Sequence, residues 1–100
     1  MSLDDLIVVL RVAEFRNITA AATSLDMRAA TASAAVKRVE QELGVELFVR
    51  STRRLRLSAA GEKYLPHCKQ AIDLLSQAQQ NLRSEVDSVT GEIRLSVSSD

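Results

Sequence analysis

Residues 17–44 of this chain read NITAAATSLDMRAATASAAVKRVEQELG, and this stretch decides the fold. It predicts two helices joined by a tight turn at Asp26 and Met27, the second helix covering residues 28–43. Apolar side chains recur in the second helix at spacings of three and four, which gathers them on one face. That face comprises Ala32, Val36, Val39 and Leu43, and the opposite face comprises Ala30, Ala34, Lys37 and Gln41, flanked by Ser33 and Arg38. A helix of this kind packs by one side and can bring the other close to an anionic partner such as DNA.

The segments on either side extend this unit. Residues 3–16 carry a broad apolar stripe and predict a helix, for which Ser2 is a suitable N-cap. Gly44 is expected to end the helix at residues 28–43. Residues 47–57 change to the period of a strand, because leucine alternates with arginine up to Leu57. We interpret residues 47–57 as a basic two-stranded wing beside the two helices, although an ordinary hairpin edge kept in solution by its arginines would show the same alternation.

Charge is distributed unevenly along the chain. The 100 residues contain 13 basic and 13 acidic side chains and have no formal net charge. Residues 17–57 nevertheless hold seven basic and four acidic side chains, a net charge of +3. Four of the seven are the arginines between Arg50 and Arg56, a run without an acidic residue. Positive charge therefore gathers where the two helices and the wing lie, as expected for a nucleic-acid-binding surface.

One long helical pattern follows, over residues 58–90. It contains a heptad seam with alternating spacings of three and four, formed by Leu65, Cys68, Ile72, Leu75, Gln79, Leu82, Val86 and Val89. Such a seam must be buried against another helix. Because no other predicted element is long enough to cover it, we expect a second copy of the chain to do so. The helix is therefore interpreted as a linker and dimerisation helix.

Composition narrows the function classes. The single Cys68 cannot form an internal disulfide, and no apolar run approaches the length of a membrane span or of a signal peptide core. A cytoplasmic protein is expected. The only histidine, His67, adjoins Cys68 on the long helix, so neither a nucleophile–base pair nor a metal site can be assembled. We expect no enzyme, and no cofactor or metal in this fragment.

Residues 91–100 read GEIRLSVSSD and predict one strand, with nothing after it to complete a sheet. The chain is thus expected to be the N-terminal part of a longer protein, ending just inside its next domain.

These motifs resemble a known family along essentially the whole chain. The segments LDDLIVVLRVAE, NITAAATSL and TASAAVKRVEQELGVELFVRSTRRLRLSAAGEKYLP resemble the N-terminal DNA-binding domain and linker helix of LysR-type transcriptional regulators. The resemblance implies a mainly α fold: a winged helix-turn-helix of three helices and a two-stranded wing over residues 1–58, with the helix-turn-helix at about 18–43, followed by the long dimerisation helix. It also implies promoter DNA as partner, a dimer and often a tetramer, and a small-molecule effector bound by a C-terminal domain that begins at residues 91–100.

The resemblance further implies which residues meet DNA. It places Thr19 near a phosphate at the start of the first helix of the pair. The remaining positions lie on the recognition helix and the wing, and they are Arg28, Ala29, Ala30, Thr31, Ser33, Ala34, Lys37, Arg38, Arg53 and Arg54.

This sequence departs from the family pattern at two places. Arg28, Ala29 and Ala30 stand where many members carry Ser, Gln or Arg and then Pro or Ser, and Ala34 stands where many carry arginine. A long side chain that reads guanine by two hydrogen bonds is therefore missing from the centre of the face. Either Arg28 or Arg38 supplies it, or recognition relies on thymine methyl groups against alanine and on groove shape.

A second hypothesis belongs to another class of protein. The winged unit could be a protein–protein interaction module that does not bind DNA, since the zero net charge permits it. Reversing the charges of Arg53 and Arg54 separates the two hypotheses: DNA retention should collapse under the first, whereas a protein interaction should survive under the second.

Overall fold

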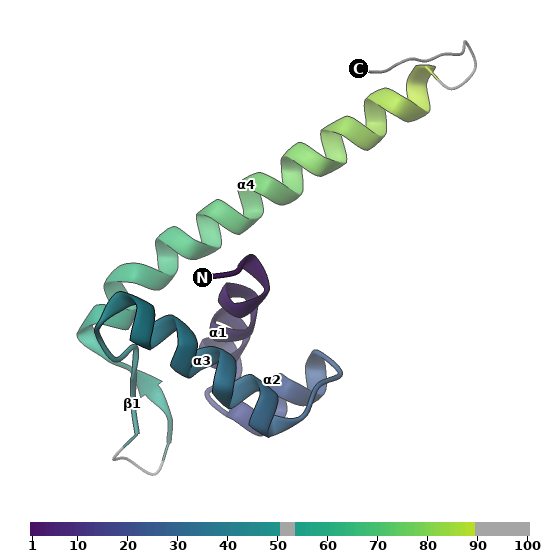
Figure 1. The fold of residues 1–100 in the computed structure, drawn as a ribbon. Helices are drawn as coiled ribbons and strands as arrows, with labels where there is room; N and C mark the ends of the chain where they lie inside the picture. The colour runs from purple at the N-terminus through teal and green to yellow at the C-terminus, as the bar shows by residue number, and fades with distance from the viewer. Residues whose placement is uncertain (51–53, 90–100) are drawn as a thin grey trace. The chain divides into compact units, whose positions relative to one another are not determined.

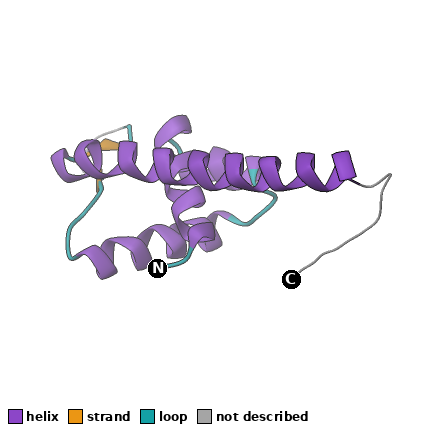
Figure 2. Ribbon diagram, turned by 90° about the horizontal axis from the view of Figure 1, so that it is seen from above, coloured by secondary structure: helices purple, strands orange, loops and turns teal. Residues whose placement is uncertain are grey.

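The computed structural model describes residues 1–50 and 54–89, with side chains up to residue 85. Its elements are α1 (Leu3–Phe15), α2 (Ile18–Ser24), α3 (Ala29–Leu43), β1 (Phe48–Val49), β2 (Arg56–Leu57) and α4 (Ala59–Val89). Figures 1 and 2 show that the described residues are helical except for the short hairpin and the connecting loops. The chain divides into two compact units, residues 1–70 and residues 71–100. The predicted class, three helices with a two-stranded wing and a long helix, is confirmed.

The first two helices begin at the side-chain caps that their sequence predicts. The Ser2 hydroxyl accepts a hydrogen bond from the Asp5 amide at 3.1 Å, and the Asn17 carboxamide oxygen accepts one from the Ala20 amide at 2.8 Å. Each bond satisfies an amide that the first turn of a helix leaves without a partner. The second helix thus begins after Asn17 and leaves Thr19 inside its first turn.

The turn between α2 and α3 is as tight as predicted. Asp26 adopts a left-handed conformation with φ of 56°, which Asp tolerates better than most residues. The Met27 amide then returns to the Ala22 carbonyl at 2.9 Å. Ala21 and Ala22 of α2 are buried, as are Ala32 and Ala35 of α3, and such small side chains let two helix backbones approach closely. At the other end of α3, Gly44 closes the helix with φ of 74°.

The core of the first unit lies among α1, α2, α3, the wing and the first turns of α4. Its largest fully buried side chains are Phe48, Leu47, Val9, Val12, Val36 and Val39. Leu47 comes from the link between Gly44 and β1, and Phe48 is the first residue of β1, so this link and the start of the wing are part of the core. The wing is a single antiparallel pair, in which Phe48 faces Leu57 and Val49 faces Arg56.

Helix α4 starts at a junction built around Leu47. The Ser58 hydroxyl accepts a hydrogen bond from the Gly61 amide at 3.1 Å, as expected of an N-cap, and donates one to the Glu46 carbonyl at 2.6 Å. The Ser58 amide donates to the Leu47 carbonyl at 2.8 Å. Gly61 is buried against that same carbonyl, where no side chain fits: a Cβ atom there would overlap the Leu47 oxygen and lie 3.0 Å from a methyl group of Leu57.

The structure corrects the expectation for the start of the heptad seam. Leu65 and Cys68 are only 4% and 5% exposed and belong to the core of the first unit, so one chain covers them without a second copy. Burial also raises the pKa of the Cys68 thiol. A heptad spacing identifies the apolar face of a helix but not what covers it, and here the globular unit covers its first two positions.

The second unit carries the later seam positions. Ile72 is half-buried, and Gln79 is exposed. The leucines are more open: Leu75 is 48% and Leu82 63% exposed, and Leu74 beside the seam is 68% exposed. The seam residues Val86 and Val89 lie outside the described side chains, and the strand expected at residues 91–100 lies outside the described residues. No helix in the described ranges has the length and apolar character needed to cross a membrane.

Candidate nucleic-acid interface

The outward face of α3 is lined by small and cationic side chains, as predicted. Ala30, Thr31, Ala34, Lys37 and Gln41 are exposed, and Ser33 is half-buried. The first half of α3 exposes only short side chains, those of Ala29, Ala30, Thr31 and Ala34 among them. Such side chains leave the helix backbone accessible to a partner that approaches closely. Lys37 is the cation on this face that the described residues leave without an ion pair.

The start of α3 lies open in the same way. Arg28 is the N-cap residue, and its side chain makes no capping hydrogen bond. It is exposed together with Ala29 and Ala30. The first-turn amides of α3 therefore lack the side-chain acceptor that caps α1 and α2, and the guanidinium of Arg28 adds charge at this end. Unsatisfied amides at a helix start favour an anion such as a phosphate oxygen.

Thr19 lies in the first turn of α2 and is exposed. Its carbonyl accepts a hydrogen bond from the Thr23 hydroxyl at 3.0 Å, one turn further along the helix. The structure thus places Thr19 at a helix start, as the resemblance implied.

Arg38 is engaged within the protein. Its Nε and one terminal nitrogen donate to the two carboxylate oxygens of Asp5, both at 2.9 Å, which joins α1 to α3. The Asp5 side chain is 14% exposed and that of Arg38 58% exposed. Hydrogen bonding from Arg38 and its positive charge together lower the pKa of Asp5 from 3.8, against an opposing effect of burial. The two-pronged geometry occupies one edge of the guanidinium and restrains its orientation, which leaves fewer donors for a guanine base.

The lowered pKa of Asp5 predicts an acid-sensitive contribution to stability. A carboxyl whose pKa is depressed in the folded chain stabilises it above its unfolded value of 3.8, and this contribution is lost as pH falls through the folded pKa. We therefore expect Asp5→Asn to lower the urea midpoint at pH 7, and the difference from the parent chain to shrink as pH falls below about 4. Asp4→Asn, an exposed neighbour in the same helical turn, is the matched control. A gap that stays constant from pH 7 to pH 3 would contradict the assignment.

A second acid–arginine pair lies on the other edge of α3. Glu40 is only 8% exposed, and one of its oxygens accepts the Leu47 amide at 2.7 Å. Arg50 donates to both Glu40 oxygens, at 3.0 and 3.3 Å. Glu40 is thus bonded to the segment around β1, and Arg50, one of the arginines of the basic run, has a specific partner within the protein.

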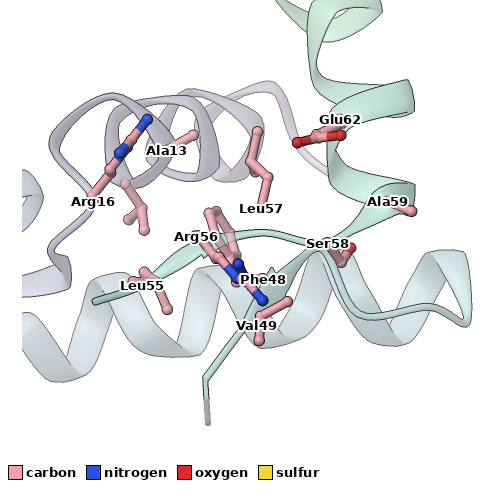
Figure 3. A pocket seen from close by; sticks show the side chains of 11 residues that line it. Ala13, Arg16, Phe48, Val49, Leu55, Arg56, Leu57, Ser58, Ala59 and Glu62 are labelled. Atoms are coloured by element: carbon pink, nitrogen blue, oxygen red, sulfur yellow. The ribbon is translucent and has the colours of Figure 1, made fainter. Parts of the chain in front are cut away.

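The wing presents arginine outward, as the alternation predicted. Arg54 and Arg56 are exposed, whereas Leu55 and Leu57 are half-buried. Arg53 lies outside the described residues. A cavity of about 460 Å³ lies behind the wing, between the last turns of α1 and the start of α4. Figure 3 shows Arg16 and Glu62 on opposite sides of this cavity, with Leu55, Leu57 and Phe48 between them.

Taken together, the first unit presents a helix-turn-helix whose second helix is exposed along one face, next to a hairpin that carries arginine. Figure 1 shows the hairpin beside the C-terminal end of α3, with α2 nearer the other end. A long exposed helix beside a basic β-wing is the arrangement of the winged helix-turn-helix class of DNA-binding domains. The fold and the site therefore define that class.

Comparison with known proteins identifies the family. Residues 3–62 match the model described as "Bacterial regulatory helix-turn-helix protein, lysR family". The chain belongs to this family of DNA-binding transcription regulators, as the sequence motifs indicated.

Individual relatives agree with the family match. The chain is 36% identical over 95 residues to the HTH-type transcriptional activator IlvY of Haemophilus influenzae, which covers 95% of this chain and 32% of the relative. It is 34% identical over 87 residues to the HTH-type transcriptional regulator ShiR of Corynebacterium glutamicum, covering 87% of this chain and 30% of the relative. The chain thus spans about a third of the length of these curated relatives.

Solved structures support the same fold. The DNA-binding domain of CbnR in complex with DNA superposes with a TM-score of 0.78 at 29% identity, covering 86% of this chain and 99% of that one. The DNA-binding domain of BenM in its complex with catB site 1 DNA gives a TM-score of 0.83 at 22% identity, over 86% of this chain and 97% of that one. The second likeness is evidence for the fold alone.

Two functional partners escaped sequence reasoning. The contact between Asp5 and Arg38 was not predicted, and Glu40 was not linked to Arg50. Asp5 and Arg38 are 33 residues apart, so no local spacing reports their contact. For Glu40 a signal existed, because an acidic residue that lies next to the buried stripe of an amphipathic helix requires a cationic or amide partner.

Proposed function

We propose that this chain binds promoter DNA as one half of a symmetric dimer, with α3 in the major groove and the wing at the adjacent backbone or minor groove. The observation that carries the proposal is the exposed, alanine-rich face of α3 with the unpaired Lys37, beside the exposed arginines of the wing. Residues 1–58 form the DNA-binding domain in this proposal and residues 58–90 the linker. The contacts assigned to Thr19, Ser33 and Arg53 belong to the same proposal.

The dimer is supported by the exposed apolar residues of α4. Leu75 and Leu82 lie seven residues apart on the seam, and both are about half exposed or more. Exposed leucines at heptad spacing favour pairing with a second helix. Two recognition helices would then meet major grooves about one helical turn apart, or a multiple of it. The proposal has four further parts: assembly to a tetramer, an effector site in a further C-terminal domain, a cytoplasmic location and the lack of catalytic activity. The roles of the curated relatives as regulators support these parts.

The salt dependence of binding tests this function. A dimer that neutralises about six phosphates should lose ~10³-fold in affinity between 50 and 200 mM salt, because bound phosphates release their counterions. Selection from random duplex DNA supplies the probe and also gives half-site identity and spacing. Fluorescence anisotropy with the selected duplex then measures affinity. Binding that changes less than about twofold over this salt range would refute the proposed mode.

Arg28 is favoured over Arg38 as the guanine reader. The guanidinium of Arg38 is held by Asp5 through two hydrogen bonds, whereas that of Arg28 is exposed at the start of α3. We therefore expect Arg28→Ala to relax base preference at one position of each half-site, at about 1–3 kcal/mol per lost two-bond contact. Repeating the selection with Arg28→Ala and with Arg38→Ala tests this. A motif that changes only for Arg38→Ala would reverse the assignment.

A further inference from the structure

We propose that Glu40 is a positioning residue for the wing: its carboxylate holds the strand β1 against the recognition helix and thereby sets where the wing arginines meet DNA. The inference rests on the proposed function and adds a residue that touches no DNA itself. It comes from the contacts of one carboxylate that belongs to α3 and bonds almost entirely to the wing side of the unit.

The contacts of Glu40 bracket β1. Oε2 accepts from the Leu47 amide at 2.7 Å and lies 3.4 Å from the Phe48 amide, just before and at the first residue of the strand. Both oxygens accept from Arg50, the residue directly after the strand, at 3.0 and 3.3 Å. One side chain of the recognition helix thus accepts hydrogen bonds at both ends of the two-residue strand. We call this set of contacts the Glu40 clamp.

The clamp also affects the position of β2, because β2 pairs with β1 in the wing. Val49 of β1 pairs with Arg56 of β2, and Phe48 pairs with Leu57. A two-stranded ribbon of this length has only a few bonds of its own and is marginal in water without support from outside. The position of Arg56 relative to α3 is therefore set by what holds β1: the burial of Leu47 and Phe48 in the core at its start and, on the side of Arg50, the clamp.

Burial makes this contact specific. The Glu40 side chain is 9% exposed, whereas that of Arg50 is 39% exposed. A charge so buried is tolerated only in a fixed geometry with its hydrogen-bond partners in place. If Glu40 loses its charge, Arg50 can turn into water while Leu47 and Phe48 stay buried. The expected response is therefore a wing held less firmly against α3 from Arg50 onward, in a domain that remains folded.

The test measures which nucleotides of the bound duplex lie next to the wing. Arg56→Cys, carried by every variant compared, provides an exposed thiol on β2 for an iron chelate, which cleaves the DNA backbone near the position of the label. The native Cys68 is 5% exposed, and burial raises the pKa of its thiol, so labelling is directed to the introduced residue. The probe DNA is the duplex recovered by selection from random sequences, at saturating protein and at a temperature well below unfolding.

In the labelled chain that retains Glu40, cleavage should fall on a few nucleotides next to each half-site. In Glu40→Gln the same total cleavage should spread over about twice as many nucleotides, affinity should drop about tenfold, and the bases selected opposite α3 should not change. Arg50→Lys keeps the charge but loses the two-pronged bond, and should give an intermediate spread. Glu46→Gln makes the same change of charge at an exposed residue near the wing and should leave the pattern intact.

Other outcomes overturn the proposal in distinguishable ways. If Glu40→Gln weakens binding but keeps the narrow cleavage pattern at saturation, Glu40 serves stability alone. Should Glu46→Gln spread the cleavage equally, the effect is one of net charge. If the labelled parent chain binds no selected duplex at all, the proposed function itself fails and the wing has no DNA to be positioned on.

Discussion

Replacing Gly61 by alanine should destabilise the first unit by about 3 kcal/mol, although alanine is the better helix former. In an open helix this change would stabilise by about 1 kcal/mol. Here the new Cβ would overlap the Leu47 carbonyl oxygen and press on a methyl group of Leu57 at 3.0 Å. The carbonyl cannot turn aside freely, because it accepts the Ser58 amide at 2.8 Å. Overpacking against a carbonyl held in place should destabilise the fold by more than the higher helix propensity of alanine stabilises it.

Urea unfolding followed by circular dichroism measures this effect. Gly44→Ala is the matched control, because Gly44 has open space around it and only a left-handed φ of 74°. That substitution should cost about 1–2 kcal/mol for the backbone conformation alone. Small domains have a free energy of unfolding of only about 5–15 kcal/mol, so a loss of about 3 kcal/mol should lower the urea midpoint clearly while the chain stays folded without urea. A Gly61→Ala chain as stable as the parent would show that the junction at Leu47 is looser than described.

Lys37→Glu should lower affinity for duplex DNA on the order of 100-fold at low salt, and by less as salt rises. The reason is that Lys37 lies on the exposed face of α3 and forms no ion pair with the described residues. Under the proposed function, reversing its charge would place a carboxylate near phosphate with no rearrangement inside the protein. The fold should be unaffected, since the substitution leaves every buried contact in place.

The control for Lys37→Glu is Lys69→Glu, the same change of charge at an exposed residue of α4. Anisotropy titrations at two salt concentrations with the selected duplex compare the two variants with the parent chain. We expect the slope of log affinity against log salt to fall in magnitude for Lys37→Glu alone. Equal losses in both variants would mean that total charge, and not the face of α3, governs binding.

Local sequence signals predicted most of this fold. Ser2 and Asn17 each start a helix by the capping bond that their side chains can make, and Gly44 ends one by its positive φ, so the helix boundaries follow from adjacent residues. The alternation of leucine and arginine up to Leu57 predicted the wing for the same reason. Such features depend on a few neighbouring side chains and backbone angles, and one sequence is enough to read them.

Contacts between distant segments were not predictable in this way. Arg38 was interpreted as a DNA-contacting side chain, and only the fold reveals that Asp5 lies within 2.9 Å of it. Leu65 and Cys68 matched a heptad perfectly well, yet the globular unit covers them. In both cases the side chain had two chemically suitable partners, and the choice between them depends on tertiary geometry that spacing does not encode.

The junction at Leu47 gives the domain a mechanical property. The Leu47 amide is bonded to α3 through Glu40, its carbonyl is bonded to the start of α4 through Ser58, and its side chain is fully buried. A single peptide segment thus joins α3, the helix proposed to bind DNA, to the first turn of α4. We therefore expect strain applied to the first turn of α4 to reach α3 through the two backbone bonds of Leu47.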